Sequence, residues 1–234
     1  LYLMTAPEVG VRVLRALWIC NRRSAPESFD PQDMNGGTAP MLTKENLSPI
    51  EEFLGSKHEN YFAIDGGHFP LKALAQGRKN GVIYDITLGV SQFAMPRSEI
   101  VFRNNYLDCN RIELGFATHE QHGPLAQLMA SVISDVANMP WIEHDILWHS
   151  HTFDSPNIKN FSQILLINPV YVKDLEHPQW RNFMGNRINL LWLVPITAEE
   201  LSFLREKGIA ELISICPEPQ KLHIFDGKPK FILR

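Results

Sequence analysis

Two nearly continuous apolar runs constrain the fold more than any other feature of this sequence. They are FSQILLI at residues 161–167 and RINLLWLV at residues 187–194. Strands that are covered on both faces have this character, because neither face of the sheet meets water. We therefore predict that both runs are central strands of a sheet with other elements packed on its two sides.

Further segments predict additional strands. VIYDITL at residues 82–88 is rich in β-branched and aromatic residues, and RIELGFA at residues 111–117 alternates. Near the C-terminus, KLHIFDGKPKFIL at residues 221–233 surrounds the turn dipeptide Asp226-Gly227 with apolar residues. We predict a terminal hairpin there, with its proline on an edge strand.

Helical periodicity marks segments that would pack on this sheet. The clearest is PLAQLMASVISDVANMP at residues 124–140, where apolar residues recur every three or four positions between two bracketing prolines. Thr197 and Glu200 form a capping box that opens a second helix, and Gly208 is expected to end it in a left-handed cap. A further helix is predicted over residues 9 to about 21 from its apolar spacing.

The N-terminal region combines a predicted loop with a helix start. Residues 24–40 are rich in Pro, Gly, Asn and Asp, and we expect a surface loop. Ser48, Pro49 and Glu51 then have the pattern of a capped helix start. The elements together predict an α+β fold in a single domain over residues 1–234, a mixed, mainly antiparallel central sheet of about five to seven strands flanked by helices.

Composition excludes several classes of function. The net charge of −4 provides no general basic field to attract a nucleic-acid backbone. The longest apolar stretches fall far short of the roughly 20 residues that span a bilayer, and the first residues lack the features of a secretion signal. Three scattered cysteines, an odd number, favour reduced thiols. We therefore expect a cytoplasmic protein that binds neither nucleic acid nor membrane.

The stretch HDILWHSH at residues 144–151 is the strongest candidate for chemistry. In an extended strand, Asp145, His149 and His151 would lie on one face. Three such ligands with an open position for water would suit a catalytic zinc ion. We favour the alternatives, in which the histidines bond the backbone at a strand end or belong to a binding surface, while Trp148 packs inward.

Other catalytic signatures are missing from the sequence. It has no P-loop, no dinucleotide-binding fingerprint, no nucleophile elbow and no HExxH motif. Cys109 or Ser150 could act with a histidine base only as a nucleophile without a local signature. Glu200 is explained by helix capping, and Glu199 by the helix dipole. We therefore expect no enzymatic activity and no cofactor.

Several of these segments, taken in order, carry a family resemblance. They are YDITLGVS, RIELGF, the long helix, LWHSHT, FSQILLINP and NLLWLVPITAEELSFLREKGIAELI. Gly89-Val90-Ser91 matches a Gly-Leu-Ser, and Trp148-His149-Ser150 a Trp-His-Ser, of the animal Suppressor of fused domain. His151-Thr152 is similar to the Gly-His-Thr of bacterial members. The series resembles the Suppressor of fused family most specifically over residues 82–215.

The resemblance implies a binding protein rather than an enzyme. Animal members look like clamps, in which this domain and a C-terminal domain close around a peptide segment of Gli transcription factors. His144 and Val132 stand where that resemblance would place an acidic residue and a tyrosine important for Gli, so the Gli-binding chemistry is not carried over. Bacterial stand-alone members are commonly interpreted as immunity proteins that neutralise toxin domains.

We therefore expect a non-catalytic module that sequesters or inhibits a protein partner, such as a toxin domain. A metal-dependent hydrolase that uses Asp145, His149 and His151 is the alternative hypothesis. The residues that we expect to contact the partner are Asp145, His149, His151 and Asp154.

Overall fold

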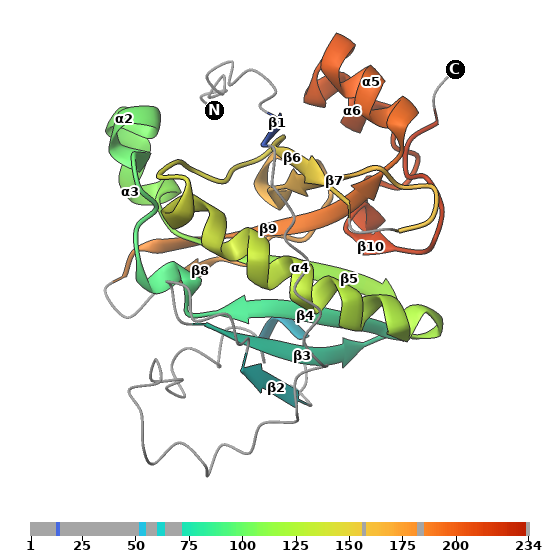
Figure 1. Cartoon of the computed structure of the whole chain (residues 1–234), viewed down its shortest axis with the longest axis horizontal. Coiled ribbons are helices and arrows are strands. Elements are labelled where there is room, and N and C mark those ends of the chain that lie inside the picture. Colours follow the sequence, from blue (N-terminus) through green and yellow to red (C-terminus); the bar gives the residue numbers. More distant parts are fainter. Residues whose placement is uncertain are drawn as a thin grey trace.

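The computed structural model describes residues 13–14, 52–54, 60–63, 72–155, 158–181 and 185–232. Ten strands in this part of the chain form the sheet seen in Figure 1. They are β1 (Val13–Leu14), β2 (Asn60–Ala63), β3 (Ala73–Lys79), β4 (Val82–Leu88), β5 (Ile112–His119), β6 (Thr152–Asp154), β7 (Gln163–Ile167), β8 (Trp180–Arg181), β9 (Arg187–Ile196) and β10 (Ile224–Phe225).

The sheet is mixed and mainly antiparallel. Its main path runs in the order β1-β6-β7-β9-β5-β4-β3-β2, while β8 pairs with β9 and β10 with β5 beside this path. Among the strands that the structure describes, only the pairs β1–β6, β5–β9 and β5–β10 are parallel. The predicted α+β class and single domain are confirmed. The strands outnumber the expected range because β1, β8 and β10 are two residues long and leave little pattern in the sequence.

The two apolar runs are central strands, as predicted. β9 lies between β7 and β5, and every residue of β7 is buried. Leu191 and Leu193 of β9 pack into the core on one face of the sheet, whereas Leu190 and Trp192 pack into the core on the other. Burial on both faces explains why the run shows no alternation of polar and apolar residues.

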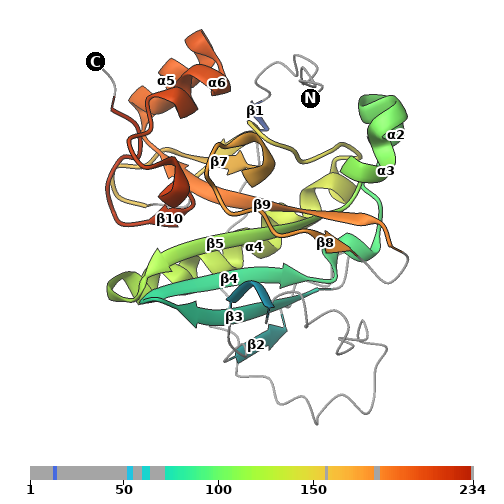
Figure 2. The same ribbon diagram turned by 180° about the vertical axis from the view of Figure 1, so that it is seen from behind.

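Helices cover the two faces of the sheet unequally. The long helix α4 (Gly123–Ile142) lies across one face, as Figures 1 and 2 show from opposite sides. Helices α5 (Ala198–Lys207) and α6 (Ile209–Ser214), together with the helical residues 52–54, pack into the core of the other face. The short helices α2 (Ser98–Phe102) and α3 (Tyr106–Cys109) lie at one end of the sheet.

The predicted helix boundaries need small corrections. Pro140 lies inside α4 rather than ending it, and the helix continues to Ile142. Proline has no N–H, so one helical hydrogen bond is lost, but only the last turn of the helix follows this position. The capping box of α5 is confirmed, with the Thr197 hydroxyl accepting from the Glu200 N–H at 3.2 Å. Gly208 ends α5 with a φ of 84°, but its ψ of 170° is extended rather than left-handed helical.

The predicted terminal hairpin is wrong. β10 pairs in parallel with β5, and no second arm follows it among the described residues. Instead, the Glu200 carboxylate accepts the N–H groups of Lys230 and Phe231, each at 3.0 Å. These backbone donors are thereby satisfied at the start of α5, and Phe231 is buried in the core there.

The predictions for the N-terminal region are tested at few positions. A helix over residues 9 to 21 is wrong at Val13–Leu14, which form β1, and its other residues lie outside the described part of the chain. The loop at residues 24–40 and the capping residues 48–51 also lie outside it. No helix that the structure describes is long and apolar enough to cross a membrane.

Candidate functional site

The segment 144–151 is a series of turns and not a strand. His144 and Ser150 both have positive φ, at 51° and 74°, which breaks the alternation that a strand would give. The Asp145 N–H bonds the Pro140 carbonyl at the end of α4, and the Ser150 N–H bonds the Leu166 carbonyl of β7. The side chains of this segment are therefore not aligned along one face.

The four predicted contact residues occupy different environments. Asp145 is half-buried, with its carboxylate 4.0 Å from the guanidinium of Arg97. His151 lies in the interior at 3% exposure, which contradicts its expected place on the surface. Asp154 is exposed and accepts a hydrogen bond from Gln163 at 2.6 Å. The structure therefore does not bring these four side chains together on one surface.

The catalytic alternatives find little support in the geometry. No three His, Cys, Asp or Glu side chains of the described residues are grouped so that they could hold a metal ion. Burial raises the pKa of the Cys109 thiol to about 11, which keeps it protonated. Ser150 is buried. Neither candidate nucleophile is activated in the way that covalent catalysis requires.

His149 is neutral and serves as a hydrogen-bond acceptor. Its Nδ1 atom accepts the Asn168 N–H at 3.2 Å, so the proton of the neutral ring is on Nε2. Burial, with a smaller effect of His151, lowers the pKa of His149 to about 4. The Asn168 side chain in turn caps the short helix η5 (Pro169–Tyr171) by accepting the Val170 N–H at 3.1 Å.

Four aromatic rings connect this segment to α2 and η5, and we call them the aromatic platform: Phe102, Trp148, His149 and Tyr171. The Trp148 ring packs on Phe102 at 4.8 Å between centroids. It also meets the Tyr171 ring edge-on at 6.4 Å between centroids. The Tyr171 ring stacks on His149 at 5.0 Å and 28°. Tyr171 therefore stays 41% exposed while its ring contacts with Trp148 and His149 hold it in place.

Exposed apolar side chains gather on the elements around the platform. They are Ile100 at 68%, Leu107 at 55% and Val170 at 43% exposure, beside Tyr171. α2 and α3 lie at the end of the sheet where β9 begins, and α3 contacts β9 (Figures 1 and 2). Several large apolar side chains on adjoining elements are more typical of an interaction surface than of ordinary exposure.

A buried carboxylate anchors the segment that carries α2 and α3. Glu113 of β5 accepts hydrogen bonds from the N–H groups of Gly89 and Ser91 and from the Ser91 hydroxyl. The Arg111 guanidinium donates to the Ser91 carbonyl at 2.8 Å, and Met95 N–H donates to the Asn110 carbonyl at 2.8 Å. Residues 89–111 are therefore fixed at both ends to the start of β5.

Sequence reasoning missed the groups that build this site. Glu113 lies in a run that indicates only a strand, and its role depends on donors more than twenty residues away. Tyr171 follows the strand end in INPVY, where the prolyl turn is visible but the exposure of the ring is not. Only Trp148 and His149 were found, through the motif that they form.

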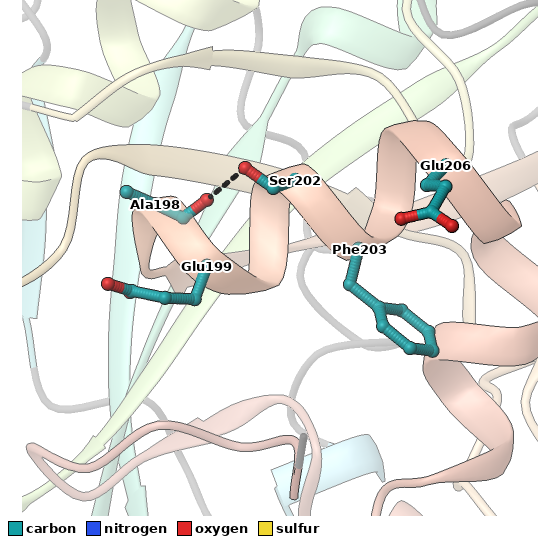
Figure 3. Close-up of a pocket in the computed structure, with 5 residues that line it drawn as sticks. All are labelled: Ala198, Glu199, Ser202, Phe203 and Glu206. Atoms are coloured by element: carbon teal, nitrogen blue, oxygen red, sulfur yellow. Dashed lines mark hydrogen bonds between the residues drawn. The ribbon is translucent and has the colours of Figure 1, made fainter. Parts of the chain in front are cut away.

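A shallow depression lies elsewhere, on α5, and Figure 3 shows its lining. Its residues are Ala198, Glu199, Ser202, Phe203 and Glu206. The Ser202 hydroxyl is bonded to the Ala198 carbonyl at 3.0 Å, within the helix itself. The lining thus holds two glutamates and one serine, and the hydroxyl of that serine is held by its own helix.

Comparisons with known proteins give one clear family match. The family described as Suppressor of fused protein (SUFU) matches residues 63–228. No curated protein matches the chain. A solved structure described as "the Sufu-Fu complex crystal structure" is similar at a TM-score of 0.47 and 14% identity, over 69% of this chain and 80% of that one. Since the family match spans most of the sequence, the chain belongs to the Suppressor of fused family.

Proposed function

We propose that this chain is a non-catalytic protein-binding module that sequesters or inhibits a partner, and that the partner is a toxin domain. The observation that carries the proposal is the exposed apolar surface around Tyr171, built on the aromatic platform. Aromatic side chains are enriched at the centres of protein interfaces, where they account for much of the binding energy. Family membership supports the same class of function.

The platform suits binding because it is organised before a partner arrives. Ordering an exposed side chain on association costs about 0.5–1.5 kcal/mol of conformational entropy. Tyr171 avoids most of that cost, since its ring is stacked on His149 and meets the Trp148 ring edge-on. We therefore assign His149 a positioning role beneath Tyr171 rather than a direct contact.

The net negative charge of the chain supports a basic toxin domain as the partner. The chain carries a net charge of −4, and such a field accelerates encounter with a basic protein. Asp145 and Asp154 are the candidate acidic contacts, whereas buried His151 would act only by supporting the fold. An inhibitor that masks another protein's active site needs a rigid complementary surface and no chemistry of its own.

Photo-crosslinking tests the proposal directly. p-Benzoyl-phenylalanine is placed at Leu107, beside the platform, and at Leu128, which is exposed on α4, as the matched control. We expect Leu107, and not Leu128, to crosslink one protein in the producing cells. Co-production of the chain should then relieve the toxicity of that protein. Equal crosslinking at both positions, or a recovered partner whose toxicity is unchanged, would contradict the proposal.

A further inference from the structure

Helix α2 lies on a segment that buries few of its own side chains. Among residues 96–107, Ser98 alone is buried, and the others are half-buried or exposed. The Ser98 hydroxyl donates to the Met95 carbonyl at 2.8 Å, so even this side chain bonds to the base of the segment. Ile100 and Leu107 are both more than half exposed. Segments with so few buried apolar contacts separate from the body of a protein at a low cost in free energy.

The two ends of this segment are held firmly. The Met95 sulfur accepts the Leu147 N–H at 3.4 Å, in addition to the bond from the Met95 N–H to the Asn110 carbonyl. At the other end, the Asn189 side chain of β9 donates to the Asp108 carbonyl at 2.8 Å, which ties α3 to the sheet. Any movement is therefore confined to the residues between Met95 and Asp108, which include all of α2.

The backbone has unusual conformations at both ends of α2. Arg97, before the helix, has a φ of 58° and a ψ of 4°, and Arg103, after it, has a φ of 48° and a ψ of −118°. Residues with a Cβ atom rarely adopt positive φ, and the pair of angles at Arg103 also lies outside the left-handed helical region. Such backbone strain persists only where surrounding contacts enforce it, and hinges are residues that absorb large changes of φ and ψ. We call α2 with these two residues, 97–103, the lid.

Two side chains of the lid reach the turn segment 144–151. The Phe102 ring packs on Trp148, with 4.8 Å between centroids and 60° between planes. The Arg97 guanidinium lies 4.0 Å from the Asp145 carboxylate, but Arg97 is half exposed, and ion pairs of that kind contribute little. The aromatic contact is therefore the stronger of the two, and it helps to keep Trp148 at 7% exposure.

We propose that the lid opens by rotation about its two terminal arginines, and that an aromatic side chain of the partner protein takes the place of Phe102 on Trp148. The inference rests on the proposed function and names what the partner presents. An aromatic ring restores the pair that is lost on opening, and release of the strain at both hinges offsets part of the cost. The other three rings of the platform lie outside the lid and stay in place.

Pulsed dipolar EPR on the whole chain measures the position of the lid without a partner. Nitroxides are attached to p-acetylphenylalanine at Ile100 on the lid and at Leu128 on α4, both of which are exposed. We expect two distances between the labels, with the closed one dominant. Phe102→Ala removes the ring that holds the lid, so the share of the second distance should rise at least about threefold. Labels at Ser202 on α5 and at Leu128 form the control pair and should give one distance in both chains.

The hinge is tested by glycine substitutions in the Phe102→Ala background, where the open lid is well populated. Arg103→Gly removes the strain of the closed lid, because glycine adopts positive φ without a steric cost, and the share of the second distance should fall about threefold. Asn104→Gly is the matched control, since Asn104 is exposed and its φ is not positive, and it should not lower that share. An equal fall for both glycines would overturn the hinge at Arg103. Thermal unfolding of each variant checks that the fold is retained.

The outcomes separate this inference from the proposed function. A single distance that is the same in wild type and Phe102→Ala would overturn the lid. A partner crosslinked at Leu107 should shift the labels to the second distance and bind Phe102→Ala at least as tightly as wild type. A partner that binds with the distances unchanged, or that binds Phe102→Ala more weakly, would overturn the inference while the proposed function stands. Two distances without any crosslinked partner would contradict the proposed function and leave the movement of the lid established.

Discussion

Ser91 donates two hydrogen bonds to the carboxylate of Glu113, from its N–H at 3.0 Å and from its hydroxyl at 2.6 Å. The Gly89 N–H adds a third at 3.1 Å and the Thr87 hydroxyl a fourth at 2.5 Å. One buried side chain therefore satisfies the turn from which the segment with α2 and α3 departs. The surface proposed to bind a partner depends on this internal contact.

We expect Glu113→Ala to lower the free energy of unfolding by about 3 kcal/mol or more, because it leaves several buried donors without an acceptor. Urea unfolding measures the change. Glu113→Gln retains one acceptor oxygen and should lose less. Glu99→Ala, on exposed α2, is the control and should stay within about 0.5 kcal/mol of wild type. Equal unfolding free energies of Glu113→Ala and wild type would show that this hydrogen-bond network does not stabilise the fold.

Asp85 predicts a loss of stability as pH rises. Its carboxyl is fully buried, one oxygen accepts from Gln76 at 2.8 Å, and the other has no hydrogen-bond partner among the described residues. Burial raises its pKa from 3.8 to about 7. Between these values the folded state holds a proton that the unfolded chain has released, so this group's stabilising contribution falls from pH 4 to pH 7.

Asp85→Asn should remove that contribution. Its unfolding free energy should exceed that of wild type by an amount that grows between pH 4 and pH 7, on the order of 1–4 kcal/mol at the upper end. Denaturant unfolding at a series of pH values measures the difference. A constant difference across this window would mean that Asp85 titrates normally in the folded protein.

For His223 we predict the opposite change of stability with pH. It packs on Trp192 at 4.8 Å between ring centroids, and its Nδ1 atom has no hydrogen-bond partner among the described residues. Burial, then the charges of Lys230 and Lys79, lower its pKa from 6.5 to about 4. Below pH 6.5 the His223 ring binds a proton in the unfolded chain but stays neutral in the folded one. The folded state is therefore less stable as the solution is acidified toward pH 4.

His223→Phe should therefore be less sensitive to acid than wild type between pH 6.5 and pH 4. Part of the slope will remain, because burial lowers the pKa of His149 to about 4 as well. Thermal unfolding followed across this range gives the two slopes. Parallel curves for wild type and His223→Phe would contradict the assignment.

The close approach of Gly115 and Trp192 predicts a steric effect. A Cβ atom added at Gly115 would lie 2.6 Å from the indole ring, which is fully buried between β5 and the core. Gly115→Ala should destabilise the fold by about 1–3 kcal/mol through overpacking. Gly123→Ala at the start of α4 meets no atom within 4 Å and provides the control. If Gly115→Ala has the same unfolding free energy as wild type in urea, the Trp192 ring moves aside to make room for the added methyl group.

The sequence predicts those features whose physical cause is local or uniform. Apolar runs identify β7 and β9 because burial on both faces leaves one visible signature, and the Thr197–Glu200 box is visible because its partners are three residues apart. The hairpin prediction failed because the Glu200 carboxylate captures backbone donors thirty residues away. No local pattern reports such a contact.

The candidate site was predictable only as a motif. The clustered histidines of the segment pointed to Trp148 and His149. The positive φ at Ser150, however, breaks the strand alternation from which a common face for the predicted residues was inferred. The exposed member, Tyr171, comes from a different strand end and joins the site through its ring contacts with His149 and Trp148. Exposure is a property of the packed chain, and alternation within a strand therefore could not identify the surface.

Tyr171 and its support give the prediction that tests function most directly. Tyr171→Ala should weaken binding of the crosslinked partner by about 2 kcal/mol or more, as for an aromatic residue at the centre of an interface. Because the ring is 41% exposed, the unfolding free energy should change much less. Titration calorimetry with the partner measures the first quantity and urea unfolding the second.

The support beneath Tyr171 can be tested separately. Trp148→Phe retains a ring beside Phe102 but removes the larger indole that meets the Tyr171 ring edge-on. The tyrosine then samples other rotamers, and binding should weaken by a smaller amount, mainly through added ordering cost. Combining Trp148→Phe with Tyr171→Ala should add almost nothing to Tyr171→Ala alone, because the indole acts on binding through the tyrosine. Fully additive losses would show that Trp148 acts independently of Tyr171, and that the platform does not preorganise the binding surface.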